Sequence, residues 1–371
     1  MMDDLSLIIG DRQLMGWEGI RVTRGIERMP SDFDVLMTER YPGELSSFVI
    51  QDGDEVIVKL GEDRVITGYV DRFVPSIDAR QHSIQVSGRG KCADLVDCAA
   101  EWPGSQISNS NALDIAAKLA QPYGISVSTD VDVGRVVPQF NLMLGETVYE
   151  IIERVSRWRA LLVYDDVFGN LVLSRVGTRA AACGFQEGVN VQSASIAYSM
   201  DQRFSEVQAY RVATDTFHDL GDRGNLIGTA MDPNVPRHRR HIVVAESGDA
   251  YEEVVTARAL WEIARRFGRS YQLNLTTDSW RDSEGALWTP NTLVPVSLPS
   301  LKLKQASWVI SEVTYRRDEQ SGTTADLVIM PREAFLVEPL LNQPFPRDVA
   351  ESLGQFTSDI EESLAQFGGA R

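Results

Sequence analysis

Cysteine and histidine are both scarce in this chain, which limits the chemistry that it can carry. Three cysteines are present, Cys92, Cys98 and Cys183, and four histidines. A small and odd number of cysteines does not form a disulfide framework and is typical of a protein made in a reducing compartment. No two cysteines have the spacing of a C-x-x-C motif. The sequence therefore predicts neither a disulfide-stabilised fold nor a cofactor.

Basic charge and long apolar runs are lacking as well. The chain has 36 lysine and arginine residues against 53 aspartate and glutamate residues, a net charge of −17. Such an acidic surface repels phosphate, which disfavours sequence-independent binding to a nucleic acid backbone. The N-terminus, MMDDLSLIIGDRQ, has acidic residues where a secretory signal needs basic ones. No apolar run approaches the roughly 20 residues of a membrane span, so we expect a soluble protein that no standard signal exports.

What the chain does have is a dense set of short strand patterns near its N-terminus. From Gly53 to Ala100, apolar and polar residues alternate, beginning with Val56 and Val58, and turn residues interrupt the alternation. Alternation with a period of two between turns predicts an antiparallel meander. With the strand patterns that precede it, the first hundred residues should hold about six strands. That density is typical of a sandwich or a barrel.

Changes in pattern divide the chain into four regions. The predicted fold class is α+β, mainly β, with two small antiparallel β-barrels in a pseudo-repeat, an inserted α+β domain and a helix-containing domain. In the inserted domain, Ser110 or Asn111 can cap a first helix, and Gly145-Glu146-Thr147 should open a second, each followed by an apolar stripe. The predicted boundaries are 1–100 for the first barrel, which 189–215 could complete, 101–188 for the α+β domain, 189–340 for the second barrel and 341–371 for a helical tail.

Two segments of the second barrel region should differ from strands. Residues 213–241 contain turn residues, including Gly224, Gly228 and Asp232-Pro233-Asn234, which favour an irregular loop. Residues 249–267 carry an apolar face at helical spacing, so we expect a long helix there.

The tail from residue 341 onward carries one apolar stripe with acidic residues on its other faces. The stripe residues recur every three or four positions: Val349, Leu353, Phe356, Ile360, Leu364 and Phe367. Two interpretations stay open. The stripe either binds a partner, which could be another copy of the chain or another protein, or it folds back onto its own domain.

One basic segment interrupts this acidic chain, and it consists of Arg237, His238, Arg239, Arg240 and His241. As a metal site it lacks nearby cysteine or carboxylate ligands, and its arginines would repel a cation. A phosphate site is conceivable. The favoured interpretation is a solvated loop or one that forms salt bridges, including salt bridges to a neighbouring subunit.

Other candidate sites have simpler structural explanations. Asp165-Asp166 falls in a predicted hairpin turn, where aspartate is common, and Asp130-Val131-Asp132 lacks the glycine and distal glutamate of a calcium loop. Residues 88–91, Gly-Arg-Gly-Lys, lack the spacer and the hydroxyl residue of a phosphate-binding loop. No motif joins a nucleophile to a base. We therefore expect no catalytic or metal site and no enzyme activity.

The meander also carries a resemblance to a known family. GDEVIVKLGEDRVITGYVDRFVPSIDARQHSIQVSGRGKCADLVDCAA resembles the barrel of Mu-like phage tail baseplate hub proteins, in which a strand–turn–strand ends in GYVD and continues into SGRxKxADLVD. GETVYEIIERVSRWRALLVYDDVFGNLVLSR looks like the middle domain of the same family, a helix followed by a hairpin at D-x-x-G-N-L. The resemblance runs from about Trp17 to Pro331 and rests on structural motifs. The hub of this family is also similar to the hub part of type VI secretion spikes.

The resemblance implies a structural function. Such a hub is a homotrimer whose paired barrels imitate a six-fold ring in a contractile tail, joins the tail tube to the central spike, and leaves a channel for DNA ejection. The implied partners are further copies of the chain, the central spike protein, a tail-tube or tube-initiator protein and baseplate wedge proteins, with no membrane and with genome DNA only in transit. The implied location is the baseplate of the virion tail, after assembly in the host cytoplasm.

Two other classes of function are kept open. A tail-associated enzyme that degrades cell wall or carbohydrate would need a paired acid and nucleophile in a groove, and the sequence reveals none. A DNA-binding module could act through residues 237–241, although the net charge argues against it.

Overall fold

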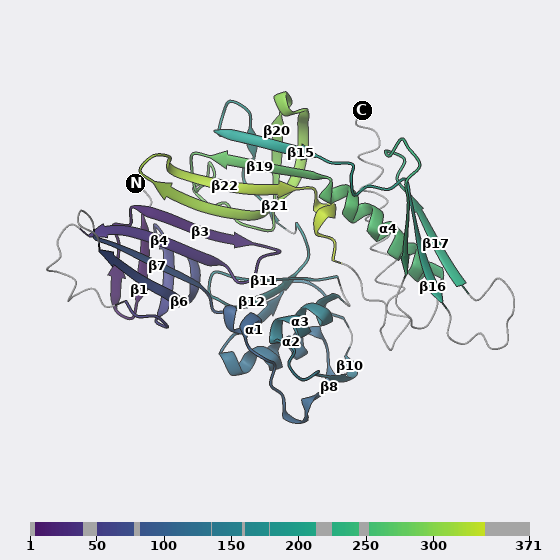
Figure 1. The fold of residues 1–371 in the computed structure, drawn as a ribbon, viewed down its shortest axis with the longest axis horizontal. Helices are drawn as coiled ribbons and strands as arrows, with labels where there is room; N and C mark the ends of the chain where they lie inside the picture. The colour runs from purple at the N-terminus through teal and green to yellow at the C-terminus, as the bar shows by residue number, and fades with distance from the viewer. Residues whose placement is uncertain are drawn as a thin grey trace.

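The computed structural model describes residues 4–39, 50–77, 82–134, 136–157, 160–177, 179–212, 225–244 and 252–337. Strands dominate, and most belong to one 14-stranded sheet, beside three smaller sheets. Figure 1 shows two curved strand layers at one end, a helix-containing body below them and a helix–sheet unit at the other end. The prediction of a mainly β fold is confirmed.

The first strand set lies in the N-terminal region. Alternate residues face its core: Val56, Val58 and Leu60 of β5 are buried, while the residues between them are not. Antiparallel pairing of β5 with β6 and of β6 with β7 confirms the predicted meander. The strands are β1 (Leu5–Ile9), β2 (Arg12–Leu14), β3 (Gly19–Gly25), β4 (Asp32–Glu39), β5 (Glu55–Leu60), β6 (Asp63–Ile77) and β7 (His82–Gly90).

A second strand set in the C-terminal region repeats the order of the first. Neighbouring strands follow the order β3, β4, β7, β6, β5 in the first set and β15, β19, β22, β21, β20 in the second. Every neighbouring pair is antiparallel in both sets. The strands of this region are β13 (Arg179–Ala180), β14 (Phe185–Gln186), β15 (Ser193–Tyr198), β19 (Tyr271–Thr277), β20 (Thr292–Leu298), β21 (Leu303–Asp318) and β22 (Gly322–Met330).

One long, bulged strand occupies the same place in each set. β6 pairs with β5 through its first half and with β7 through its second half, and its register against β7 shifts between Val70 and Arg72. β21 pairs with β20 and then with β22, and its register against β22 shifts between Ile310 and Glu312. Such a β-bulge leaves one residue unpaired and bends the strand. The two sets therefore share strand order, direction and bulge position.

A junction between β21 and β3 joins the two sets. The pairing runs antiparallel from Glu312–Gly25 to Arg317–Ile20. Buried apolar residues of both sets form one continuous core. Among the described residues, the strand order runs from β2 at one end to β15 at the other without closing on itself. Two closed barrels therefore stay a prediction.

The helix-containing body follows the first strand set and contains both predicted helices, the first capped by Asn111 and not by Ser110. Asn111 and Thr147 each form a capping box with the third residue of the helix. The buried carboxylate of Asp165 fixes this body to the first set, since it accepts hydrogen bonds from the N–H (2.9 Å) and the hydroxyl (2.8 Å) of Ser31. The elements are α1 (Ala93–Asp97), η2 (Pro103–Ser105), β8 (Gln106–Ser110), α2 (Ala112–Ala120), η3 (Gln121–Tyr123), β9 (Val127–Thr129), β10 (Val137–Asn141), α3 (Val148–Ser156), β11 (Leu162–Asp165) and β12 (Leu171–Ser174).

A helix–sheet unit forms the far end of the molecule (Figure 1). The central strand, β16, pairs antiparallel with β17 and parallel with β18. The long helix α4 packs on this sheet through Val255, Ala259 and Ile263. It ends at Arg269, close to the predicted 249–267. The elements are β16 (Glu206–Val212), β17 (Asn225–Met231), β18 (Arg240–Val244) and α4 (Glu252–Arg269), and the 3-10 turns η6 (Pro299–Leu301) and η7 (Arg332–Phe335) follow.

The prediction of an irregular loop over 213–241 is wrong for most of its described part. Residues 213–224 lie outside the described residues, but 225–231 form β17 and β18 begins at Arg240. Gly228 is a strand residue with a packing role. A Cβ atom at this position would lie 2.3 Å from the backbone of both Val255 and Thr256. Glycine is thus required because α4 approaches the strand backbone directly.

Candidate functional site

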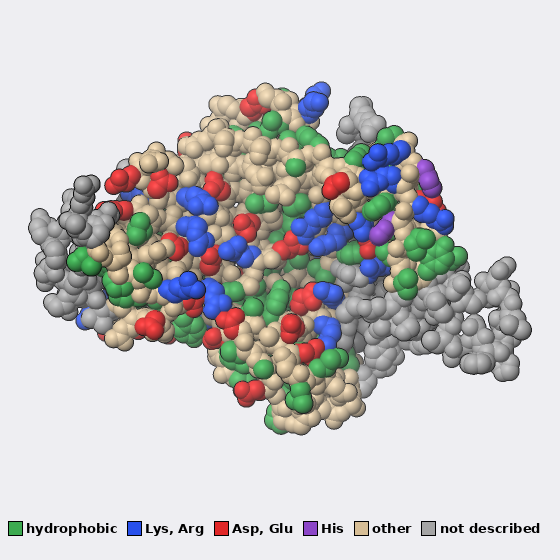
Figure 2. Space-filling view, in the orientation of Figure 1, with side chains coloured by type: hydrophobic (Ala, Val, Ile, Leu, Met, Phe, Trp, Pro, Cys, Tyr) green, Lys and Arg blue, Asp and Glu red, His purple; other side chains and the backbone are tan. Residues whose placement is uncertain are grey.

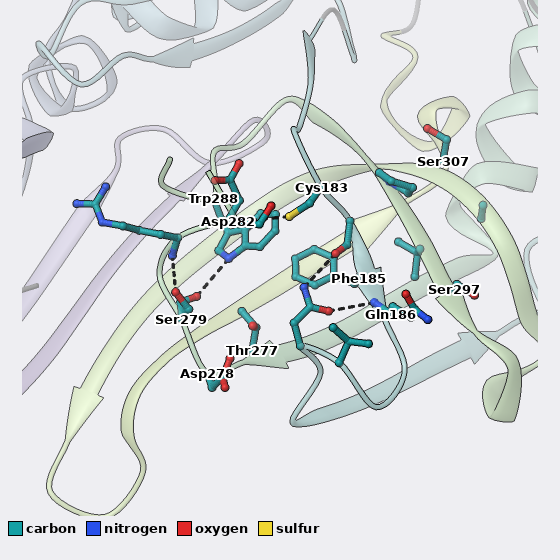
Figure 3. Close-up of a pocket in the computed structure, with 18 of the residues that line it drawn as sticks. Cys183, Phe185, Gln186, Thr277, Asp278, Ser279, Asp282, Trp288, Ser297 and Ser307 are labelled. Atoms are coloured by element: carbon teal, nitrogen blue, oxygen red, sulfur yellow. Dashed lines mark hydrogen bonds between the residues drawn. The ribbon is translucent and has the colours of Figure 1, made fainter. Parts of the chain in front are cut away.

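One cleft of the described molecule, of about 860 Å³, lies beside β20 and β21. Figure 3 shows Cys183, Phe185 and Gln186 on one side and Thr277, Asp278, Ser279 and Asp282 on the other. The rings of Phe185 and Trp288 form an apolar floor, with centroids 4.5 Å apart, and both are buried. A cleft with an apolar floor and a polar rim is the usual form of a ligand site, so the engagement of its polar groups decides what it can do.

Two charged residues of the cleft, Asp282 and Arg281, form contacts that hold the 277–288 segment in place. Asp282 accepts hydrogen bonds from the N–H groups of Glu284 and Ala286, each at 2.9 Å, as turn aspartates do. Arg281 leaves the cleft and forms an ion pair of 2.6 Å with Asp63, at the β5–β6 turn of the first strand set. The Arg281–Asp63 ion pair ties the two strand sets together. These contacts do not provide an acid and a nucleophile directed at a common point.

The basic segment singled out in the sequence divides between two environments. Arg239 is held internally, because its guanidinium donates to the carbonyls of Met200 and Asp201, the latter at 2.7 Å, and lies 5.0 Å from the ring centre of Phe204. Arg237 and His238, in contrast, are exposed. Basic, histidine and hydrophobic side chains gather over this end of the molecule in Figure 2.

His241 is also a structural residue. Its ring stacks on Phe204 with centroids 4.6 Å apart, and Nε2 lies 3.2 Å from Nη2 of Arg266. Burial first, and then the charge of Arg266, lower the pKa of His241, so the neutral ring is favoured and can accept a hydrogen bond from this arginine. Arg240 points to the other face of the sheet and donates to the side-chain oxygen of Gln208. A phosphate site made of all five residues is therefore not assembled, and a subunit contact through the exposed ones stays a prediction.

A feature that the sequence analysis missed is the apolar outer face of β17 and β18. The face opposite α4 exposes Ile227, Met231, Ile242 and Val244, the last by 75%. The polar ladder of Glu206, Gln208 and Tyr210 runs between these two columns on β16. The run from 240 to 244 is short and places apolar residues on both faces of a strand. This pattern is the signal that could have revealed the strand.

The remaining candidate acidic residues form hydrogen bonds within the fold, and Asp165 lies at the end of β11 and not in the predicted turn. Asp166 accepts hydrogen bonds from the N–H groups of Phe168 and Asn170 in a hairpin turn. Asp130 accepts one from the hydroxyl of Ser174 at 3.0 Å. Residues 88–90 are the last three residues of β7, and Lys91 follows them. The apolar stripe of the tail, Val349 to Phe367, lies outside the described residues.

The described residues hold neither a cluster of metal ligands nor a helix suited to cross a membrane. Across the described ranges, no group of three or more His, Cys, Asp or Glu side chains is placed to hold a metal ion. Within those same ranges, no helix has the length and apolar character needed to cross a membrane.

Comparison with known families assigns three parts of the chain. Residues 4–90 match the Mu phage baseplate assembly protein GpP-like N-terminal domain. Residues 92–175 match the second domain of baseplate hub protein gp44-like proteins. Residues 252–338 match the fourth domain of Mu phage baseplate assembly protein GpP.

Individual relatives extend these matches over nearly the whole chain. Baseplate hub protein gp44 of Escherichia phage Mu is 32% identical over 370 residues, which is 98% of this chain and 96% of gp44. The 43 kDa tail protein of prophage MuSo2 from Shewanella oneidensis superposes with a TM-score of 0.80 at 32% identity, covering 90% of this chain and 99% of that protein.

A more distant structure shares the fold alone. The E. coli c3393 protein, a component of the type VI secretion system with structural similarity to the T4 tail proteins gp27 and gp5, gives a TM-score of 0.56 at 11% identity. The match covers 88% of this chain and 76% of that one. The similarity to gp44 confirms the resemblance found in the sequence, and this chain belongs to the family of Mu-like phage tail baseplate hub proteins.

Proposed function

We propose that three copies of this chain form a ring in the baseplate of a contractile phage tail. The ring joins the tail tube, or a tube-initiator protein, to the central spike, contacts baseplate wedge proteins, and surrounds a channel for DNA ejection. Its location is the virion, after assembly in the host cytoplasm. The unpaired Cys92, Cys98 and Cys183 suit the reducing environment of that cytoplasm.

The observation that carries this proposal is the repetition of one strand arrangement within the chain. Two sets with the same strand order and the same bulged long strand lie side by side through the β3–β21 junction. A trimer of such a chain presents six similar sets, which matches a six-fold tube, while its three identical subunits match a three-fold spike. The proposed subunit consists of two barrel regions, the 101–188 body and the tail.

Charge supports the passage of DNA through such a ring. A net charge of −17 disfavours adhesion of the phosphate backbone to the protein. The exposed basic residues, Arg237, His238 and Arg240, are proposed to meet acidic groups of a neighbouring subunit. The tail stripe, Val349 to Phe367, is proposed to bind a partner or another subunit.

We further propose that the hub has no catalytic role. The carboxylate of Asp282 and the guanidinium of Arg281 in the cleft are engaged by the fold, which supports this view. A zymogram on cell-wall material tests it, because clearing by the purified chain would identify a tail-associated hydrolase instead.

Size-exclusion chromatography with light scattering tests the trimer. The expected mass is three times the 41.2 kDa of the chain. A monomer at micromolar concentration would contradict the proposal. Addition of the purified spike protein should then produce a larger complex in the same measurement, whereas two separate peaks would remove the spike from the list of partners.

A further inference from the structure

Each strand set of the described sheet has a strand edge without a partner. β15 pairs with β19 on one edge, and within the described residues no strand pairs with its other edge. The second half of β6, residues 72–77, pairs with β7, and in the same described chain nothing pairs with its opposite edge. Unpaired edges of this kind readily accept another strand.

The internal repeat shows what each edge is shaped to accept. The part of β21 that corresponds to residues 72–77 is 312–317, because the bulge after Ile310 corresponds to the bulge after Val70. Residues 312–317 pair with β3. The strand that holds the position of β3 in the second set is β15. The β3–β21 junction thus has one counterpart that is not filled within a single chain, namely β15 with β6.

Exposure of the side chains agrees with a missing neighbour. Val313 and Thr314, which are covered by β3, are 0% and 7% exposed. Val74, which corresponds to Thr314, is 47% exposed, and Ile77 near the end of the same strand is 76% exposed. Apolar side chains on an open strand edge mark an interaction surface.

We infer that β15 of one subunit pairs antiparallel with residues 72–77 of β6 in the next subunit. The inference rests on the proposed ring and names the strands that close it. Transfer of the β3–β21 register through the equivalences Ile20 to Ala194 and Arg317 to Ile77 fixes the alignment. The resulting opposite residues are Phe73–Tyr198, Val74–Ala197, Pro75–Ile196, Ser76–Ser195 and Ile77–Ala194.

The direction of the backbone groups provides an independent check of this register. The N–H of Ser199 donates to Ser270 at 2.9 Å on the β19 side, so alternation turns the N–H and C=O groups of 194, 196 and 198 to the free edge. In the β3–β21 junction, the N–H of Ile26 donates to Ser311 at 2.9 Å, which makes 313, 315 and 317 the hydrogen-bonded positions. Their counterparts are 73, 75 and 77. The register places these opposite 198, 196 and 194, so the available groups meet.

Pro75 removes one donor from this junction. Proline is tolerated in a strand where its nitrogen faces an open edge, and its carbonyl still accepts from Ile196. A proline and a bulge on an exposed edge also discourage pairing with unrelated strands. The junction is therefore suited to one specific partner, the β15 edge of a second copy of this chain.

Cysteine pairs across the inferred junction test it in the full-length chain. In all variants Cys98 and Cys183 are replaced by serine, and the buried Cys92 is kept. Val74→Cys with Ala197→Cys occupies a non-hydrogen-bonded pair, where Cα atoms lie roughly 4.5 Å apart and a disulfide can form. Ser76→Cys with Ser195→Cys is the second such pair.

The matched control is Ser76→Cys with Ser199→Cys, whose positions are four residues out of register, roughly 13 Å apart. After mild oxidation, the two aligned pairs should give at least about tenfold more chain-to-chain disulfide than the control on a non-reducing gel, because the trimer holds the thiols at high effective concentration. Peptide mass spectrometry identifies the linked residues.

A charge at the edge gives a second measurement. Val74→Lys should shift the protein from trimer to monomer in light scattering, while Ile227→Lys, on a side chain of equal 47% exposure in the helix–sheet unit, should not. A monomeric unmodified chain would refute the proposed ring itself. A stable trimer in which neither aligned cysteine pair links more than the control, or which Val74→Lys leaves intact, would refute the β15–β6 junction alone.

Discussion

Substitution of Gly228 by alanine is expected to loosen the helix–sheet unit. A Cβ atom on Gly228 would lie 2.3 Å from the backbone of Val255 and Thr256, well inside the 3.4 Å at which ordinary contact begins. The obstacle is backbone, so no side-chain rotation relieves it, and α4 must move outward by about 1 Å. A gap of that size weakens the contact of Ala259 and Ile263 with the sheet. We expect a cost of about 3 kcal/mol.

Hydrogen–deuterium exchange measures this effect locally, which matters because a chain with several bodies need not unfold in one step. A cost of about 3 kcal/mol corresponds to roughly a hundredfold faster exchange in α4 and β17. Thr229→Ala is the matched control, since it changes the same strand on its exposed face and should alter exchange only slightly. Exchange in α4 that stays within about threefold of the unmodified protein would refute the packing argument.

Three further substitutions test other buried contacts. Asp232→Asn should cost about 3 kcal/mol in denaturant unfolding, because Arg203, paired with Asp232 at 2.6 Å, keeps a buried charge without its counter-charge. If Asp232→Asn costs the same free energy of unfolding in a chain that already carries Arg203→Met, this explanation is contradicted. Burial raises the pKa of Asp165, so the folded state loses stability as pH rises from 3.8 through the raised pKa. The Tm of Asp165→Asn minus the Tm of the unmodified chain should therefore increase as pH rises above about 4, and a constant difference would exclude the buried carboxylate as its cause. Tyr315 is buried, which raises its pKa to about 12, and its hydroxyl donates to the carbonyl of Trp288, so Tyr315→Phe should lower stability by about 1 kcal/mol in thermal unfolding, and an unchanged Tm would count against that bond.

Features encoded by short stretches of sequence were predictable. The capping residues Asn111 and Thr147 act within one turn of the helix they begin, and both helices are found. The alternation of Val56 and Val58 is read directly as a buried strand face. Local hydrogen bonds and local periodicity determine such elements, so one sequence is sufficient for them.

Features that depend on distant segments were not predictable in the same way. Gly228 indicated a turn by composition, but its role is set by the backbone of α4, which lies later in the chain. The cleft floor brings Phe185 against Trp288, and the Arg281–Asp63 ion pair joins residues more than two hundred positions apart. The β15 edge became visible as a candidate surface only when the two strand sets could be compared strand by strand.

The junction of β3 with β21 also sets the order in which this protein can be completed. Thr23 and Thr314 hydrogen bond at 3.2 Å across it, although they are 291 positions apart in the chain. During synthesis, β3 emerges early and keeps one edge without its native partner until β21 has left the ribosome, so contacts of this separation form late and slowly. A chain that stops before Leu303 exposes that edge permanently. Only chains that extend past β21 can bury the edge of β3, and a product that ends before β21 is thereby prevented from adopting the native arrangement of the two strand sets.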